Sequence, residues 1–388
     1  MSENFIVAVA GAGSMGSGIA QVAATAGHRV ILYDNVPGAA EGALKKMAEA
    51  LSKLVEKGKL SKDRADAIWS AIQPADSLKD MAGASLFIEA IVENLEHKKD
   101  LFKTAESLLT KDAILATNTS SLSVTAIASA CADPSRCIGL HFFNPAQLMP
   151  LVEVIPAVQT EKGLAGRCVD LMKAWGKVPV IAKDTPGFIV NRLARPFYGE
   201  SLRILEEGIA DIATIDWALK SQGGFKMGPF ELMDLIGNDI NYTVTETVWT
   251  QMYYDPRYKP SLIQKKMMEA GRLGRKSGRG YYDYTGVGEN PGPVEDIELA
   301  RSVFMRVLCM LINESAEALH LKVASRDELD LAVTRGVNYP KGLLAWADEI
   351  GIARVLETLD GLYAEYGEDR YRSSVLLKRY AGNKLSFY

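Results

Sequence analysis

Apolar residues follow two different periods along the chain. Up to about residue 184, short apolar runs bounded by polar or turn residues alternate with amphipathic stretches of helical spacing. The runs that predict strands cover residues 5–10, 29–34, 85–94, 113–121, 137–143, 151–155 and 177–182. Strands separated by helices form a sheet with helices on both faces, so the pattern predicts an α/β domain with a doubly wound sheet.

A glycine-rich turn follows the first of these strands and opens a helix. Gly11, Gly13 and Gly16 have the GxGxxG spacing, and the next strand finishes in Asp34, 21 residues after Gly13. In this context the glycines permit a tight turn and a close approach of the backbone to a pyrophosphate, while the acidic residue accepts hydrogen bonds from a ribose. No lysine or arginine follows Asp34 until Lys45. The sequence therefore predicts a Rossmann-type site for NAD rather than NADP.

Polar residues gather where later strands end. Glu93 closes the strand of residues 85–94, Asn118 and Ser120 follow the next strand, and His141 stands near the end of the strand after that. Ligands of doubly wound sheets bind beyond the carboxyl ends of the strands, so these four are candidate site residues. For Ser120 an equally good interpretation is the cap of the helix that follows.

His141 and Glu153 form the candidate catalytic pair. His141 is expected at the exposed end of its strand, and Glu153 lies among aliphatic residues of the run 151–155, where a carboxylate needs a partner to offset its desolvation. A carboxylate on one ring nitrogen fixes the tautomer and stabilises the imidazolium that forms when the other nitrogen takes a proton. The alternative is a strand-end histidine and an edge glutamate that never meet.

A helical pair, predicted at residues 38–72, interrupts the alternation of strands and helices. Apolar residues at helical spacing mark the first helix, and Ser61 can cap the second. The pair is rich in basic residues: Lys45, Lys46, Lys53, Lys57, Lys59, Lys62 and Arg64. Such a run is usually a solvated face, but beside a nucleotide site it could also bind a second phosphorylated molecule.

The second half of the chain is helical and contains a repeat. GESLRIL at 199–205 matches NESAEAL at 313–319, and Asp216 matches Asp330, both at an offset of 114 residues. The predicted domains are 1–184 for the sheet, 185–284 for the first helical unit, 285–296 for a linker and 297–388 for the second unit. Asn191 corresponds to Met305, so a chemical role of Asn191 cannot be repeated, and one active site is expected.

Composition excludes several classes of partner. With 388 residues, 48% of them hydrophobic, and a formal net charge of −4, the chain is not a nucleic-acid binder by charge. The longest run without charged residues, 113–132, holds too many serines, threonines and asparagines for a membrane span. The four cysteines lack any metal-binding spacing, which predicts buried thiols in a reducing cytoplasm and no metal site.

Seven motifs in this order and spacing carry a family resemblance: GAGSMG, Asp34, IVENL, NTSSL, HFFNP, LVEVI and DTPGFIVNR. Together they resemble the L-3-hydroxyacyl-CoA dehydrogenases over essentially the whole chain. Within the family, the sequence most resembles bacterial members that have a tandem carboxyl-terminal domain. These members act on 3-hydroxyadipyl-CoA or 3-hydroxybutyryl-CoA. The resemblance implies NAD-dependent oxidation of an L-3-hydroxyacyl-CoA to the 3-ketoacyl-CoA.

The resemblance also implies residue roles. His141 would be the general acid/base, Glu153 its orienting partner, and Ser120 and Asn191 donors to the oxygen on carbon 3. Lys59 and its neighbours would touch the coenzyme A phosphates. The expected cofactor contacts are Gly11, Gly13, Ser14, Met15, Gly16, Asp34, Glu93, Lys98 and Asn118.

Arg195 lies four residues after Asn191, hence one helical turn away on the same face. It could bind the terminal carboxylate of a six-carbon acyl chain, or it could pair with surface carboxylates as arginines mostly do. Two other functions stay open: a dehydrogenase of a free hydroxy acid, and a non-enzymatic NADH-binding protein. The second helical unit could take the place of a dimer partner, so we expect a monomer or a weak homodimer.

Overall fold

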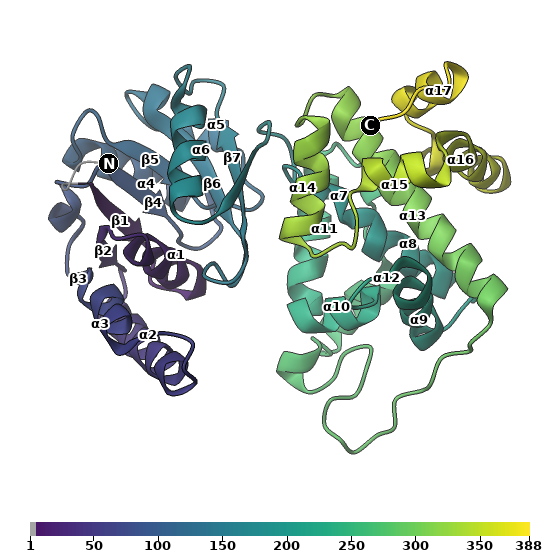
Figure 1. Ribbon diagram of the computed structural model, residues 1–388, viewed down its shortest axis with the longest axis horizontal. Helices are drawn as coiled ribbons and strands as arrows, with labels where there is room; N and C mark the ends of the chain where they lie inside the picture. The colour runs from purple at the N-terminus through teal and green to yellow at the C-terminus, as the bar shows by residue number, and fades with distance from the viewer. Residues whose placement is uncertain (1–4) are drawn as a thin grey trace. The chain divides into compact units, whose positions relative to one another are not determined.

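The structure is a computed structural model that describes residues 5–388. The chain forms two compact units, Met1–Phe188 and Ile189–Tyr388. The first unit contains the sheet and the second is helical, as the purple-to-teal and teal-to-yellow parts of the ribbon show (Figure 1). None of the helices within residues 5–388 has the length and apolar content needed to cross a bilayer.

The first unit is built on an eight-stranded sheet of order β3-β2-β1-β4-β5-β6-β7-β8. The strands are β1 (Ile6–Ala10), β2 (Arg29–Tyr33), β3 (Ile72–Ala75), β4 (Leu86–Glu89), β5 (Ile114–Thr117), β6 (Cys137–Phe142), β7 (Leu151–Pro156) and β8 (Val178–Ile181). All neighbouring pairs are parallel except β6 and β7, which are antiparallel. The strand order reverses between β1 and β4, and such a switch point opens a ligand crevice at the carboxyl ends of the strands. The doubly wound fold class is confirmed.

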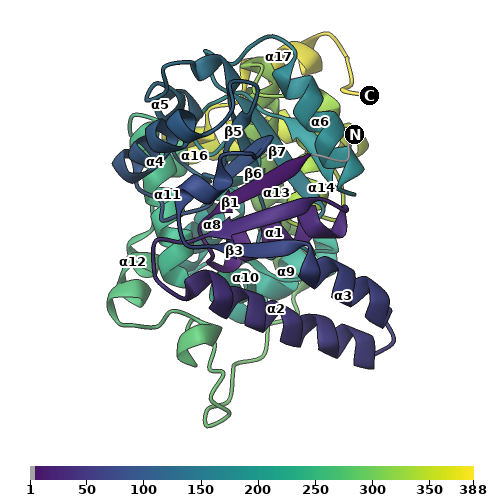
Figure 2. The ribbon, with the colours of Figure 1, turned by 90° about the vertical axis from the view of Figure 1, so that its left-hand side faces the viewer.

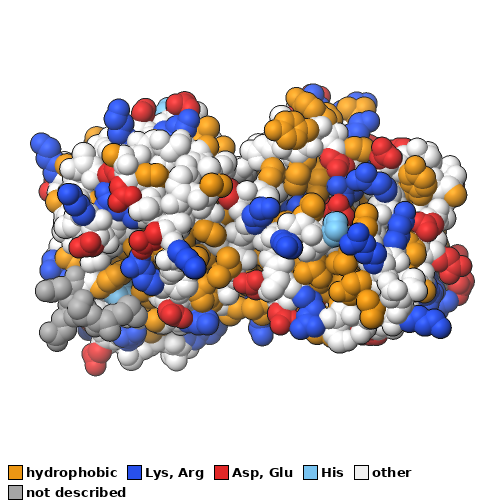
Figure 3. Space-filling model, turned by 90° about the horizontal axis from the view of Figure 1, so that it is seen from above, with side chains coloured by type: hydrophobic (Ala, Val, Ile, Leu, Met, Phe, Trp, Pro, Cys, Tyr) orange, Lys and Arg blue, Asp and Glu red, His pale blue; other side chains and the backbone are white. Residues whose placement is uncertain are grey.

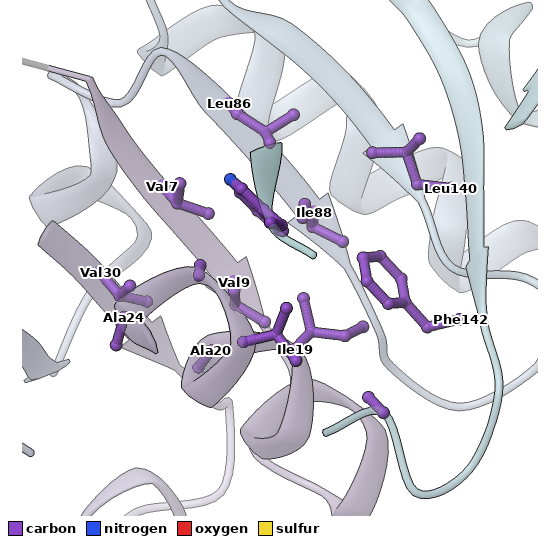
Figure 4. Close-up of a cluster of buried hydrophobic side chains, with 14 of the residues drawn as sticks. Val7, Val9, Ile19, Ala20, Ala24, Val30, Leu86, Ile88, Leu140 and Phe142 are labelled. Atoms are coloured by element: carbon purple, nitrogen blue, oxygen red, sulfur yellow. The ribbon is translucent and has the colours of Figure 1, made fainter. Parts of the chain in front are cut away.

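Six helices complete this unit: α1 (Ser14–Thr25), α2 (Ala39–Glu56), α3 (Lys62–Ser70), α4 (Leu95–Leu108), α5 (Val124–Ala128) and α6 (Leu164–Ala174). Single 3-10 turns, η1 (Leu78–Met81) and η2 (Pro134–Arg136), lie in the connections. The helical pair α2 and α3 lies side by side beside β3, a strand that the sequence analysis missed (Figure 2). One large apolar core joins α1 to the strands, and Figure 4 shows Val9, Ile19 and Phe142 converging in it.

The second unit contains the two repeats. The first repeat comprises α7 (Val190–Leu193), α8 (Arg195–Glu206), α9 (Ile212–Gly223), α10 (Pro229–Ile236), α11 (Asn238–Gln251), η3 (Pro256–Tyr258), α12 (Leu262–Glu269) and η4 (Arg275–Ser277). The second comprises α13 (Ile297–His320), α14 (Arg326–Gly336), α15 (Leu343–Ile350), α16 (Ile352–Tyr366), η5 (Asp369–Tyr371) and α17 (Val375–Gly382). Pro196, which lacks a backbone N–H, stands in the first turn of α8, and the helix is interrupted before it, whereas α13 is continuous.

Buried carboxylates repeat their roles at the same offset. Asp216 accepts hydrogen bonds from the backbone N–H groups of Phe230 and Glu231 at the start of α10. Asp330 does the same for Leu344 and Ala345 at the start of α15. A side chain in place of either facing glycine would strike the aspartate, as the close contacts at Gly228 and Gly342 show. The two repeats therefore share one architecture.

The repeats pack on each other through reciprocal ion pairs. Arg192 of the first repeat contacts Glu314 of the second at 2.5 Å, and Arg306 of the second contacts Glu200 of the first at 2.7 Å. Arg306 and Glu314 lie 114 residues after Arg192 and Glu200, so the two contacts are related by a pseudo-two-fold exchange of repeats. All four side chains are buried.

On the molecular surface, basic and acidic side chains are interspersed over the face seen in Figure 3.

Candidate active site

The glycine-rich turn has the geometry that its sequence predicts. Gly11 has a φ of +104°, and a Cβ there would lie 2.4 Å from the carbonyl oxygen of Ala90. A Cβ on Gly16 would lie 1.8 Å from the carbonyl oxygen of Gly11, whereas one on Gly13 would meet open space. No side-chain hydrogen bond caps the amino end of α1, whose N-cap is Gly13. The turn therefore offers free backbone N–H groups to an anion, as a pyrophosphate site requires.

Asp34 stands directly after β2 beside this turn. Its carboxylate accepts hydrogen bonds from the backbone N–H of Ala12 at 2.7 Å and of Val36 at 2.9 Å. A cavity of about 660 Å³ opens here, lined by the glycine turn, Asp34 and one face of α2, including Lys46. The fixed carboxylate and the open turn suit the ribose and pyrophosphate of NAD, so these residues fit the cofactor.

A buried ionic network lies at the ends of β4 and β5. Lys98 of α4 donates to Glu89 at 2.5 Å and lies 3.2 Å from Glu93. Thr117 donates to the second oxygen of Glu89 at 2.7 Å. Glu89 and Lys98 are almost fully buried, so each needs the other to offset its desolvation. Glu89 was not among the predicted site residues, although a single acid that closes the apolar run LFIE was a usable signal.

The Glu93 carboxylate organises the turn that carries Ser120. Its Oε1 atom accepts from the hydroxyl of Thr119 at 2.5 Å, the N–H of Ser120 at 3.0 Å and the N–H of Ser121 at 3.1 Å. Burial would raise the pKa of Glu93, but Lys98 and these donors outweigh it and hold the pKa below its ordinary value. The interpretation of Ser120 as a helix cap is wrong, because Ser123 is the N-cap of α5.

His141 and Glu153 are brought together by the antiparallel pairing of β6 and β7. The two residues are direct partners in the register, and His141 Nδ1 lies 2.6 Å from Glu153 Oε2. Because a carboxylate only accepts, Nδ1 must carry the proton, which leaves Nε2 as an acceptor. No hydrogen bond to Nε2 occurs within the described part of the chain. The alternative in which the two side chains never meet is therefore wrong.

The surroundings of His141 differ from expectation. The ring is 5% exposed rather than open to solvent, because Phe143 and Phe188 pack against it with ring centroids 4.5 and 5.9 Å away. Asn118 accepts a hydrogen bond from the N–H of Phe142 at 2.8 Å and so ties the end of β5 to β6. Glu93, Asn118, Ser120 and His141 thus lie at or just beyond the ends of β4, β5 and β6.

The remaining candidates lie elsewhere. Lys59 is exposed on the turn between α2 and α3, and Asn191 lies in α7 of the second unit. Arg195 begins α8 and is buried, so the interpretation as an arginine pairing with surface carboxylates is wrong. Its guanidinium donates to the Asn191 carbonyl at 2.8 Å and to the Thr245 hydroxyl at 2.8 Å.

Comparison with known families assigns the chain. A sequence model described as the NAD binding domain of 3-hydroxyacyl-CoA dehydrogenase matches residues 6–185, and the model of its C-terminal domain matches residues 187–284 and 303–386. The chain belongs to the 3-hydroxyacyl-CoA dehydrogenase family. It is therefore an NAD-dependent oxidoreductase, and the carboxyl-terminal domain of the family is matched in both repeats.

Two relatives of this dehydrogenase align with different shares of the chain. The 3-hydroxyadipyl-CoA dehydrogenase of Escherichia coli is 37% identical, with 97% of each chain covered. The 3-hydroxybutyryl-CoA dehydrogenase of Clostridioides difficile is 42% identical, but covers 72% of this chain and 99% of its own. Among solved structures, 3-hydroxybutyryl-CoA dehydrogenase from Escherichia coli K12 has a TM-score of 0.92 at 35% identity, covering 98% of this chain and 99% of its own.

Proposed function

We propose that this dehydrogenase oxidises an L-3-hydroxyacyl-CoA to the 3-ketoacyl-CoA with His141 as the general base and Glu153 as its orienting partner. The observation that carries the proposal is the 2.6 Å contact between His141 Nδ1 and a fully buried carboxylate. A buried anion bound to one ring nitrogen favours a proton on the other, which is the state that a general base reaches during the reaction.

The chemistry divides between cofactor and protein. Held by the glycine turn and Asp34, NAD would supply the acceptor for the hydride that leaves carbon 3 of the substrate. The hydroxyl proton leaves for Nε2 of His141, and Glu153 stabilises the imidazolium that results. In the reverse direction the imidazolium returns this proton, while Ser120 and Asn191 donate to the carbonyl oxygen; one such donor can contribute about 3 kcal/mol.

The remaining residues bind the two ligands. Gly11, Gly13, Ser14, Met15, Gly16 and Asp34 would hold the pyrophosphate and ribose of NAD, with Glu93, Lys98 and Asn118 toward the nicotinamide. Lys59 and neighbouring lysines of the helical pair would meet the phosphates of coenzyme A. As substrate we propose 3-hydroxyadipyl-CoA. This choice is supported by the 3-hydroxyadipyl-CoA dehydrogenase of Escherichia coli, which aligns over 97% of both chains.

The test is NADH formation from a panel of 3-hydroxyacyl-CoA thioesters, with NAD and NADP compared. His141→Gln should lower kcat by about 10²- to 10⁴-fold. Glu153→Gln should lower it by about 10- to 100-fold, because a charge-assisted hydrogen bond is worth about 1.5–3 kcal/mol. The matched control is Glu161→Gln, a half-exposed glutamate that should change kcat less than two-fold. If His141→Gln keeps a third of the wild-type kcat, the proposed base is wrong.

A further inference from the structure

Arg195 is a buried cation whose known partners are all neutral. Nε donates to the Asn191 carbonyl and Nη1 to the Thr245 hydroxyl, and the guanidinium lies 5.0 Å from the ring centre of Tyr198. Nη2 has no hydrogen bond within residues 5–388, and it is not among the polar atoms sealed from solvent. Arg195 is only 6% exposed, and burial lowers the pKa of its guanidinium from the ordinary value. The charge is therefore desolvated without a counter-ion.

The other buried arginines of the described chain show what is missing. Each has a carboxylate within 4.0 Å: Arg136 with Glu106, Arg192 with Glu314, Arg306 with Glu200 and Arg370 with Glu368. Burying an unpaired charge remains unfavourable even after the surroundings relax. Arg195 alone among these five lacks the anion that would offset this cost.

The second repeat shows that the fold does not require this polar group. Arg195, Asn238, Asn241, Thr245 and Gln264 of the first repeat correspond to Cys309, Ile352, Val355, Leu359 and Leu377 of the second. Both sets are buried, and the second is an ordinary apolar core. In the first repeat the same positions hold a connected network, in which Gln264 donates to Asn241 at 3.0 Å. The fold therefore does not require a cation at this position, and a bound anion would offset the cost of burying one.

We propose that Arg195 binds the terminal carboxylate of a dicarboxylic acyl-CoA through its free Nη2. The inference rests on the proposed function, because Asn191 is there assigned to the oxygen on carbon 3. Asn191 and Arg195 are one helical turn apart, a spacing that separates Cβ atoms by about 5–6 Å. Three carbon–carbon bonds join carbon 3 to the carboxyl carbon of a six-carbon diacid, so the chain has a comparable reach. A guanidinium N–H donates a strong charge-assisted hydrogen bond to such a carboxylate.

The experiment compares kcat/KM for 3-hydroxyadipyl-CoA with that for the uncharged 3-hydroxyhexanoyl-CoA. Wild type should prefer the diacid. In Arg195→Gln the ratio should fall by about 10- to 100-fold, the loss expected for a charged hydrogen bond. Arg195→Lys should restore part of the ratio. The matched control Arg301→Gln, at an exposed arginine paired with Glu298, should leave it unchanged.

Three results would separate the alternatives. An equal loss with both substrates in Arg195→Gln would mean that the guanidinium only supports the Asn191 backbone, and the subsite would be wrong. If Arg195→Gln does not fold, inhibition of the wild type by unreactive adipyl-CoA and hexanoyl-CoA decides, because equal inhibition constants would also overturn the subsite. A wild type inactive on every 3-hydroxyacyl-CoA would instead overturn the proposed function.

Discussion

Replacing Glu93 with glutamine removes the negative charge on which the Ser120 turn is built. Four donors of residues 119–121 lie within 3.1 Å of Oε1, and Lys98 lies 3.2 Å from Oε2. An amide oxygen is a weaker acceptor than a carboxylate, with about 0.5–1.5 kcal/mol per hydrogen bond instead of about 1.5–3. The Glu93 side chain is about one-third exposed, which reduces the difference. We expect a loss of about 1–2 kcal/mol in the free energy of unfolding.

The effect on catalysis should be larger than the effect on affinity. Ser120 is the proposed donor to the substrate oxygen, and a small displacement of its turn weakens a contact made mainly in the transition state. We expect kcat to fall about 10- to 100-fold in steady-state NADH assays, with KM for NAD changed much less. The matched control is Glu96→Gln, at an exposed glutamate in the first turn of α4 that is paired with Lys99. Its kcat should stay within two-fold of wild type.

The pH dependence gives an independent check. Because the folded protein holds the pKa of Glu93 below its ordinary value of 4.5, the ionised form stabilises the fold. The stabilisation by ionised Glu93 is fully present above pH 4.5. It is lost as the pH falls through the lower pKa that Glu93 has in the folded protein. The stability gap between wild type and Glu93→Gln should thus be constant near neutrality and shrink in acid. A change of less than two-fold in kcat, or a change confined to KM for NAD, would refute the organising role and leave Glu93 as a cofactor contact.

Two further predictions concern the helical pair and the repeat interface. Lys57→Glu with Lys59→Glu should raise KM for acyl-CoA about 3- to 10-fold, more at low salt, and leave KM for NAD within two-fold; an unchanged KM would favour a free hydroxy acid as substrate. Glu314→Leu should lower the free energy of unfolding in urea by about 3–5 kcal/mol, because Arg192 and the nearby Arg257 lose their buried anion. The control Glu298→Gln, at an exposed ion pair, should cost less than about 0.5 kcal/mol, and a loss below 1 kcal/mol in Glu314→Leu would contradict the importance of the pair.

Features that depend on neighbouring residues could be predicted from the sequence. The glycine turn follows from local backbone demands, since Gly11 adopts a positive φ and Gly16 packs against its carbonyl. The repeat was visible because one architecture preserves the same capping aspartates at one offset. The pairing of His141 with Glu153 was suggested by the cost of burying a carboxylate, which leaves few acceptable partners.

Features that depend on distant contacts were missed. Strand β3 has four residues and a proline, too little for a periodic signal. The interpretation of Ser120 as a helix cap failed because Glu93, 27 residues away, accepts from the Ser120 N–H, while Ser123 caps α5. The burial of His141 depends on Phe188, which is 47 residues away in the chain. In each case tertiary packing, and not local preference, decides the outcome.

The reciprocal ion pairs have a consequence for how this protein depends on its own concentration. Two separate subunits would make such a contact only at protein concentrations above their dissociation constant. Here the contact joins two parts of one covalent chain. Tethering keeps the effective concentration of the second repeat high, however dilute the protein is. Dilution therefore does not separate Arg192 from Glu314, and the helical support beneath Asn191 holds together in a single molecule as firmly as in a crowded solution.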